Sequence, residues 1–130
     1  MTTATAVRTP IETGYALVQA ITDRRFDIVE QLGHPEIRLR SMNASGPVEV
    51  HRPEGVATFY HGEFASATSF VPVETNVRPM ADRVQITWQF DVERPDADGP
   101  ETVEQHLFIK VVDGLILRID QVCSGFRPRQ

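Results

Sequence analysis

Cysteine is scarce in this sequence of 130 residues, and its scarcity excludes several kinds of protein. Cys123 is the only cysteine, so neither an intrachain disulfide framework nor a cysteine-rich zinc site can form. Basic runs are also missing and the formal net charge is −5, which argues against binding to nucleic acid or to an anionic membrane. No apolar stretch approaches the roughly 18 residues that a membrane-spanning helix needs. Residues 1–7 lack the charged start and apolar run of a signal peptide, so we expect a cytoplasmic protein without membrane contact.

The residues that are present have the composition of one ordinary globular domain. Hydrophobic residues make up 41% of the chain and charged residues 24%. A chain of this length buries about two thirds of its unfolded surface, so one core forms without covalent staples. We expect a single domain over residues 9–126, with a flexible tail at 1–8 and a second tail at 127–130.

Helix signals occur in the first half of the chain and strand signals in the second. The pattern Thr-Pro-Ile-Glu at 9–12 has the spacing of a capping box with proline at the first helical position, and it predicts a helix that runs to residue 22. A short helix is predicted over 25–32, and a third helix opens at Pro53. Strands are predicted over 37–42, 48–52, 67–78, 83–93, 103–112 and 115–124.

This order of elements predicts an α+β fold. Helices come first and long strands joined by hairpins follow, which is typical of an antiparallel sheet with its helices gathered on one face. We expect the sheet to be strongly curved, with three helices across its concave side. Such a cone has a mouth and encloses a pocket.

The dipeptide Asp113-Gly114 is the strongest local signal in the chain. Asp-Gly between two apolar runs favours a two-residue type I′ hairpin turn, in which Val112 pairs with Leu115. If the pairing then continues regularly, side chains alternate between the two faces of the hairpin.

One predicted face of this hairpin becomes more polar away from the turn and suits the lining of a pocket. Its pairs are Lys110–Leu117, Phe108–Ile119, His106–Gln121 and Glu104–Cys123. The other face is mostly aliphatic, with Arg118 opposite Ile109 and Asp120 opposite Leu107. A largely apolar outer face with a few charges suits a contact between two copies of the chain.

Several segments resemble the nuclear transport factor 2-like (NTF2-like) superfamily, and within it the SnoaL-like small-molecule cyclases and isomerases. The resemblance covers about residues 9–125 and rests on the capped helix at 9–22, Phe26-Asp27-Ile28-Val29, Pro53-Glu54-Gly55-Val56-Ala57-Thr58-Phe59-Tyr60 and the closing hairpin over 106–120. It implies a conical α+β barrel with one deep pocket and a homodimer through the sheet. The activities it implies are cofactor-free isomerisation, epoxide hydrolysis, dehydration or cyclisation, although other members only bind or dimerise.

The sequence departs from two branches of this superfamily. Ketosteroid isomerases place a general-base carboxylate on the first strand, where this chain has residues 40–42 and no carboxylate. Limonene-type epoxide hydrolases need an acid on the last strand, where Gln121 stands. Neither activity is therefore supported.

His106 is the leading candidate for acid–base chemistry, because histidine is the side chain best suited to proton transfer near neutral pH. Glu104, one pleat away on the same face, would orient it or raise its pKa. The alternative is that His106 lies at the end of the sheet, hydrogen-bonded to Gln121, and has no catalytic role. Arg40, if turned inward, would stabilise an anion or enolate; a surface position would give it no such role.

An apolar wall is predicted to bind the substrate, with Gln121 or Tyr60 holding one of its oxygens. The wall consists of Phe59, Phe64, Trp88, Phe90 and Phe108. Core packing is the alternative for Trp88 and Phe90, which lie on a regularly alternating strand. The four histidines have no short metal-ligand spacing, so we expect no metal and no cofactor.

These residues predict a cofactor-free isomerase, cyclase or dehydratase that acts on a hydrophobic, polyketide-like small molecule in secondary metabolism. The alternative is a non-catalytic module of the same fold that binds a small molecule or dimerises. A core filled by its own side chains would leave only the dimerisation module.

Overall fold

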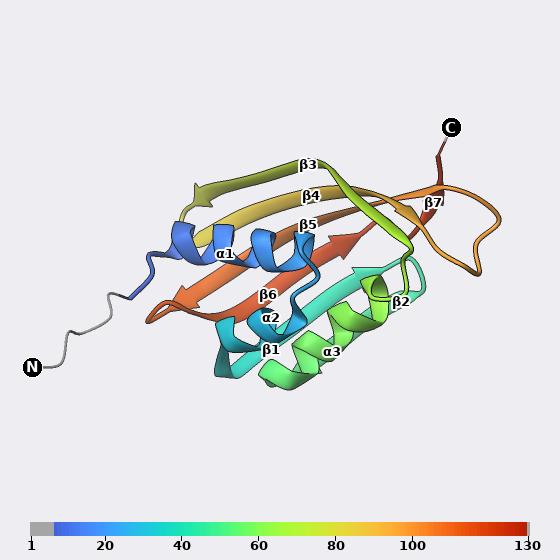
Figure 1. Cartoon of the computed structure of the whole chain (residues 1–130). Helices are drawn as coiled ribbons and strands as arrows, with labels where there is room; N and C mark the ends of the chain where they lie inside the picture. Colours follow the sequence, from blue (N-terminus) through green and yellow to red (C-terminus); the bar gives the residue numbers. More distant parts are fainter. Residues whose placement is uncertain (1–6, 130) are drawn as a thin grey trace, which may run out of the picture.

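Three helices cover one face of a single sheet in the computed structural model, which describes residues 7–129 (Figure 1). The helices are α1 (Pro10–Thr22), α2 (Phe26–Leu32) and α3 (Pro53–Phe64). The strands are β1 (Gly33–Asn43), β2 (Gly46–His51), β3 (Ser69–Met80), β4 (Arg83–Glu93), β5 (Glu101–Val112), β6 (Leu115–Cys123) and β7 (Arg127–Pro128). The predicted α+β class is confirmed, as is the order of the helices and of the long strands. None of the helices within residues 7–129 is long and apolar enough to cross a bilayer.

The predicted capping box begins α1. The Thr9 hydroxyl accepts a hydrogen bond from the Glu12 amide at 3.2 Å, and the Glu12 carboxylate accepts one from the Thr9 amide at 2.8 Å. These two bonds satisfy amide groups that the first turn of a helix leaves without partners. The helix then buries Leu17 and Ile21 completely against the sheet.

The sheet is mixed, with the strand order β2-β1-β6-β5-β4-β3 and β7 beside β5. β1 and β6 pair in parallel, so the prediction of a wholly antiparallel sheet was wrong. These two strands are far apart in the chain, and the elements between them supply the long crossover that parallel pairing needs. The strand β7 lies in the segment that was expected to be a tail. The strong curvature of the sheet stays a prediction.

A bulge interrupts the hairpin formed by β5 and β6. The first two pairs after the Asp113-Gly114 turn form as predicted, but the next pair is Lys110 with Arg118. Leu117 is therefore an extra residue on β6, and all pairs beyond it are displaced by one position from the predicted ones. The observed pairs are Ile109–Ile119, Phe108–Asp120, Leu107–Gln121, His106–Val122 and Gln105–Cys123.

This displacement reverses the predicted faces of β5. Gln105, Leu107 and Ile109 are buried beneath the helices, whereas Glu104 and His106 lie on the opposite, outer face of the sheet. The predicted pairs of His106 with Gln121 and of Glu104 with Cys123 were wrong. A single extra residue is sufficient for this error, because side chains alternate with a period of two along a strand.

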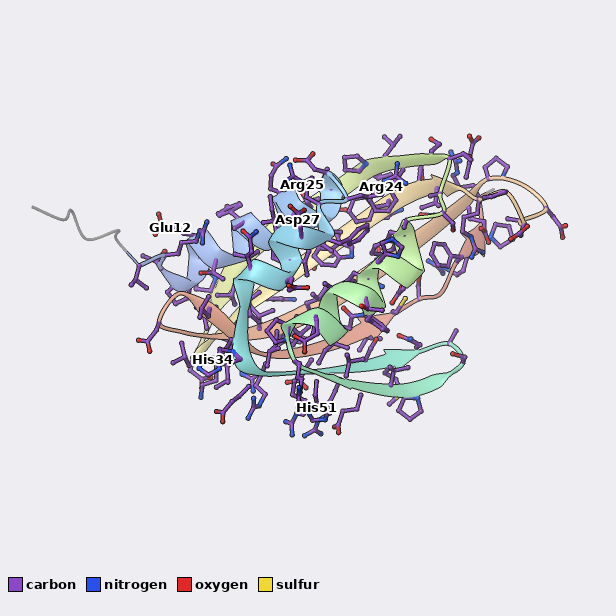
Figure 2. The ribbon with its side chains drawn as sticks, turned by 60° about the horizontal axis from the view of Figure 1, so that its bottom comes forward. Glu12, Arg24, Arg25, Asp27, His34 and His51 are labelled. Atoms are coloured by element: carbon purple, nitrogen blue, oxygen red, sulfur yellow. The ribbon has the colours of Figure 1, made fainter. Side chains whose placement is uncertain are left out.

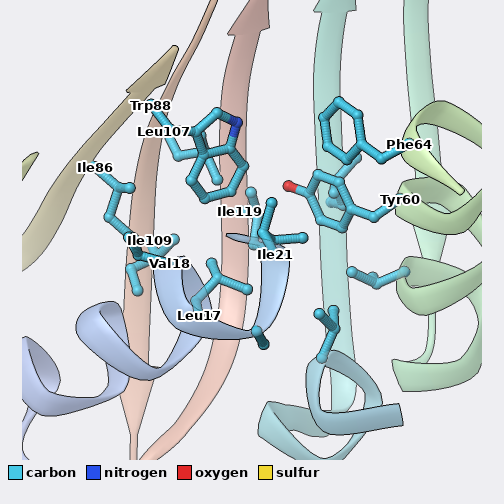
Figure 3. Packing of buried hydrophobic residues seen from close by; sticks show 14 of the residues in the cluster. Leu17, Val18, Ile21, Tyr60, Phe64, Ile86, Trp88, Leu107, Ile109 and Ile119 are labelled. Atoms are coloured by element: carbon cyan, nitrogen blue, oxygen red, sulfur yellow. The ribbon is translucent and has the colours of Figure 1, made fainter. Parts of the chain in front are cut away.

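Aromatic side chains pack together in the space between α3 and the sheet. Tyr60, Phe64, Trp88 and Phe90 have no exposed surface. Figure 3 shows Tyr60 and Phe64 reaching from α3 toward Trp88 on β4. The ring centroids of Tyr60 and Trp88 are 6.1 Å apart in an edge-to-face arrangement, and those of Phe64 and Phe90 are 6.0 Å apart. These four residues form part of the hydrophobic core.

Candidate functional site

The last turn of α3 holds a carboxyl group in a largely apolar environment. The Glu63 atom Oε2 accepts a hydrogen bond from the Gln105 side-chain amide at 3.0 Å. Its Oε1 is buried and has no hydrogen-bond donor among residues 7–129. Burial raises the pKa of Glu63 to about 7, although the bond from Gln105 opposes part of this rise. A carboxyl with this pKa can both accept and donate a proton at neutral pH.

Gln105 has a fixed orientation beside this carboxyl. The indole N–H of Trp88 donates to Gln105 Oε1 at 2.7 Å, which leaves the Gln105 amide nitrogen as the donor to its other neighbours. That nitrogen donates to Glu63 and lies 3.2 Å from the sulfur of Cys123. Burial raises the pKa of the Cys123 thiol, so the thiol is neutral and a poor nucleophile. A buried tryptophan thus positions the amide that contacts Glu63.

A hollow of about 320 Å³ lies beside Glu63, and we call it the Glu63 hollow. It is bordered by the last turn of α3, the β1–β2 turn and the end of β6; its lining includes Asn43, Ser45, Cys123 and Phe126. Its volume is at the lower end of the range of small-molecule sites. The hollow therefore has room for a small, partly apolar molecule.

Arg94 lies at the edge of this hollow and is paired with the carboxylate of Glu101. It forms two hydrogen bonds with the Glu101 carboxylate, at 2.7 and 3.1 Å. The centre of its guanidinium lies 4.0 Å from the ring centroid of Phe126, which is a close cation–π contact. By contrast, Glu63 has no ion-pair partner within the described part of the chain.

A second chain of buried polar groups ends at the same hollow. The Tyr60 hydroxyl donates to Gln121 Oε1 at 2.7 Å, and the Gln121 amide donates to the Ser41 hydroxyl at 3.0 Å. The Ser41 hydroxyl in turn donates to the side-chain oxygen of Asn43, which lines the hollow. Burial raises the pKa of Tyr60 well above its usual value, and the nearby Glu63 and Cys123 add to this effect. The phenol is therefore neutral and acts as a hydrogen-bond donor.

The predicted wall residues separate into two groups. Tyr60, Phe64, Trp88 and Phe90 lie in the core together with Gln121, and Phe59 packs against that core. Phe108 and Arg40 line a different hollow, of about 630 Å³, on the outer face of the sheet; we call it the outer hollow. The roles of these residues in binding a substrate stay predictions.

His106 and Glu104 form the predicted contact, on the outer face of the sheet. His106 Nε2 lies 3.0 Å from Glu104 Oε2, and the two side chains are 44% and 40% exposed. Thr87 Oγ1 lies 3.4 Å from the other ring nitrogen. Arg40 was expected to stabilise an anion if it turned inward. Its Nε lies 3.5 Å from Glu49 Oε1, and both side chains are more than half exposed.

Glu63 was not among the residues predicted from the sequence, although the chain contains a signal for it. Val56, Tyr60 and Glu63 follow the spacing i, i+4, i+7, which places the carboxyl on the buried side of α3. Gln105 had no comparable signal, because its position depends on the bulge at Leu117. No group of three His, Cys, Asp or Glu side chains that could hold a metal ion occurs within residues 7–129.

Comparison with known proteins identifies the fold. No family model matches the sequence, and no curated protein sequence matches it either. A solved structure from Catenulispora acidiphila, with a ketosteroid isomerase-like fold and in complex with trimethylamine, is similar with a TM-score of 0.74 and 16% identity. The match covers 90% of this chain and 88% of that one. This chain has the NTF2-like fold.

Two further structures show the range of proteins with the NTF2-like fold. A candidate polyketide cyclase from Pseudomonas putida has a TM-score of 0.70 and 14% identity, with 88% of this chain and 90% of that chain covered. An LEH-like epoxide hydrolase from M. tuberculosis has a TM-score of 0.66 and 13% identity, with 88% and 82% covered. At such identities the likeness establishes the fold, and the chemistry must be argued from the residues.

Proposed function

We propose that this chain is an acid–base enzyme that moves a proton on a small, largely apolar molecule, with Glu63 as the group that carries the proton. The observation that supports this most strongly is the carboxyl itself, which is buried and held through one oxygen by Gln105, while its other oxygen has no partner among residues 7–129. Burying such a group costs free energy, and proteins with perturbed carboxyls often use them in catalysis. Glu63 lines the Glu63 hollow, so a molecule bound there would lie beside this carboxyl.

The reaction class that fits is proton abstraction or return at a carbon next to a carbonyl, as in isomerisation, dehydration or ring closure. Phe126 and the neighbouring apolar surface would hold the hydrocarbon part of the substrate in the hollow. Asn43, at the end of the Tyr60–Gln121–Ser41 chain, would hold a substrate oxygen. Such chemistry requires only the side chains of the protein. The substrate would be a small cyclic or polyketide-like ketone, and we place the reaction in the cytoplasm.

Hydrogen–deuterium exchange tests this proposal without knowledge of the product. Cyclic, steroid-like and polyketide-like ketones that raise the melting temperature would be incubated with the protein in D₂O, and deuterium incorporation followed by mass spectrometry. We expect exchange with the wild type and a loss of about 100-fold or more in Glu63→Gln, the usual contribution of a general base. Unchanged exchange in Glu63→Gln would exclude this role.

The matched variant His106→Gln tests the pair on the outer face in the same assay. If Glu63 carries the proton, His106→Gln keeps the wild-type exchange rate. If exchange is lost in His106→Gln alone, the predicted pair of His106 and Glu104 is the acid–base machinery, and the proposal for Glu63 is wrong.

A binding module without turnover is the second candidate, and the same carboxyl favours it. An ionised Glu63 beside the ring of Phe126 would suit a small organic cation, and the similar structure from Catenulispora acidiphila is a complex with trimethylamine. Titration with trimethylammonium distinguishes the two candidates. Saturable binding that Glu63→Gln abolishes, without deuterium exchange on any ketone, would favour the binding module.

The outer face of the sheet supports self-association as a further part of the proposal. Met42 and Val122 are 56% and 55% exposed, and both line the outer hollow with Phe108. Exposed apolar surface of this kind is typical of contacts between proteins. We expect Val122→Asp to convert a dimer into a monomer in sedimentation velocity, whereas Val73→Asp, at an equally exposed site on β3, leaves the dimer intact. A wild-type monomer would exclude the dimer.

A further inference from the structure

Basic side chains occupy one row across the outer face of the sheet. Arg38 on β1 is in register with Arg118 on β6, and Arg118 is in register with Lys110 on β5. His51 on β2 is in register with Arg38 and continues the row. Figure 2 shows where His51 lies on the molecule. Adjacent strands lie about 4.8 Å apart, so the backbones of Arg38, Arg118 and Lys110 are close neighbours in a line across the sheet. This concentration of positive charge is notable in a chain with a net charge of −5.

The bulge at Leu117 creates this row. Without the extra residue, Arg118 would pair with Ile109 and face the core; with it, Arg118 pairs with Lys110 and faces outward. Bulges often occur next to functional sites, where they redirect a side chain. The neighbouring residue Ile119 remains buried, which confirms that the strand resumes its regular alternation after the bulge.

Two of the three central charges have no carboxylate partner in the part of the chain that the structure describes. Neither Arg38 nor Arg118 takes part in an ion pair with any residue of the 7–129 segment. Lys110 lies 3.8 Å from Asp82, which is 73% exposed, so that contact is weak and easily exchanged. Like charges directly opposite each other on a sheet are destabilising. The row therefore carries a repulsion that a bound anion would relieve.

The two guanidinium groups differ in how they are held. Arg118 Nη1 donates to the carbonyls of Leu117 at 2.8 Å and Glu36 at 3.4 Å, which orients the group and leaves its remaining N–H groups for a ligand. The Nε of Arg38 is buried and has no acceptor among the described residues. The terminal nitrogens of Arg38 likewise make no hydrogen bond or ion pair with residues 7–129, so they can donate to a ligand.

We propose that Arg38, Arg118 and Lys110 form a binding site for the phosphate group of a small molecule. Guanidinium groups match the geometry of phosphate oxygens and bind them through paired hydrogen bonds, and an ammonium adds a point charge. A dianion bound between three cations neutralises most of their charge, whereas a carboxylate would engage one guanidinium. The site lies across the sheet from the Glu63 hollow and does not depend on the function proposed for Glu63.

Titration of the ¹⁵N-labelled full chain with inorganic phosphate, at constant ionic strength held with chloride, tests the site. We expect saturable NMR shifts at the backbone amides of Arg38, Lys110 and Arg118. Arg118→Gln and Arg38→Gln should each weaken binding about ten-fold, which corresponds to 1.4 kcal/mol. Arg129→Gln is the control, because Arg129 follows β7, outside this row, and its Nη1 lies 3.4 Å from Asp91 Oδ2 on β4. A phosphate monoester that binds more tightly than inorganic phosphate would identify the source of the group.

Three results would overturn the proposal. The first is the absence of saturable shifts in this row, and the second is equal phosphate binding by the wild type and both arginine variants. The third is loss of self-association in Arg118→Gln without any phosphate binding by the wild type, because the row would then belong to a contact between copies. A cooperative thermal unfolding transition in both arginine variants, measured without phosphate, shows that a loss of binding is not a loss of the fold.

Discussion

The hydroxyl of Tyr60 on α3 donates a hydrogen bond to the side-chain oxygen of Gln121 on β6, with 2.7 Å between the two oxygens. Tyr60 is completely buried and Gln121 is 3% exposed. The bond thus joins the helix layer to the sheet inside the core, where an unpaired polar group is costly.

Tyr60→Phe should destabilise the protein by about 1–3 kcal/mol, because Gln121 Oε1 would remain buried without a donor. Tyr15→Phe removes the same hydroxyl from a side chain that is 57% exposed, and should change stability by less than about 0.5 kcal/mol. Urea unfolding of both variants measures the difference. Equal effects at the two positions would show that the bond to Gln121 contributes nothing.

Glu63 should make the protein less stable as the pH rises. Its pKa is about 7 in the folded state, against an ordinary value of 4.5 for a glutamate side chain. Between these two pH values the folded state therefore holds a proton that the unfolded state has released. Stability should therefore fall by about 3 kcal/mol from about pH 4.5 to pH 7, and this contribution should stay constant above that range.

Glu63→Gln removes this titration, so we expect the variant to be more stable than the wild type at pH 8. Unfolding by urea at several pH values measures the trend, and Glu30→Gln, at an exposed position on α2, is the control. If the free energy of unfolding changes equally with pH in the wild type and in Glu63→Gln across this range, the shifted pKa of Glu63 is contradicted.

Gln105→Met should raise the pKa of Glu63 above 7, because the hydrogen bond from Gln105 favours the ionised carboxylate. It should also cost stability, since the indole N–H of Trp88 loses its acceptor. Carbon-detected NMR titration of the Glu63 carboxyl measures the shift. Gln89→Met is the control: Gln89 lies on the outer face of β4, so this variant should leave the titration of Glu63 unchanged. A lower pKa of Glu63 in Gln105→Met would refute the prediction.

Gly114→Ala should cost about 1–2 kcal/mol, because residue 114 has a φ of +77° that side chains with a Cβ rarely adopt. The added Cβ would also lie 2.8 Å from a methyl group of Val7. Gly62→Ala, in α3 with no atom within 4 Å of the new Cβ, should instead stabilise by about 0.5–1 kcal/mol. The melting temperature should fall in Gly114→Ala and rise in Gly62→Ala. A change in the same direction in both variants would contradict the turn geometry.

The sequence alone determined the elements of the fold. The capping box at Thr9 and Glu12, the proline at the start of α3 and the Asp113-Gly114 turn are local signals, and each produced the predicted structure. The alternating apolar residues of β4 also identified its buried face, which carries Val84, Ile86, Trp88, Phe90 and Val92. These features depend on residues close together in the chain, so local propensity and periodicity suffice to find them.

Only the tertiary structure decided which residues share the candidate site. The extra residue Leu117 moved Gln121 away from His106 and brought Gln105 beneath α3, where it contacts Glu63. The parallel pairing of β1 with β6 aligned Arg38 with Arg118. A bulge and a crossover are set by the packing of distant segments, and a shift of one residue reverses the face of every side chain beyond it. For this reason the helices and strands followed from the sequence, whereas the environments of Glu63 and His106 did not.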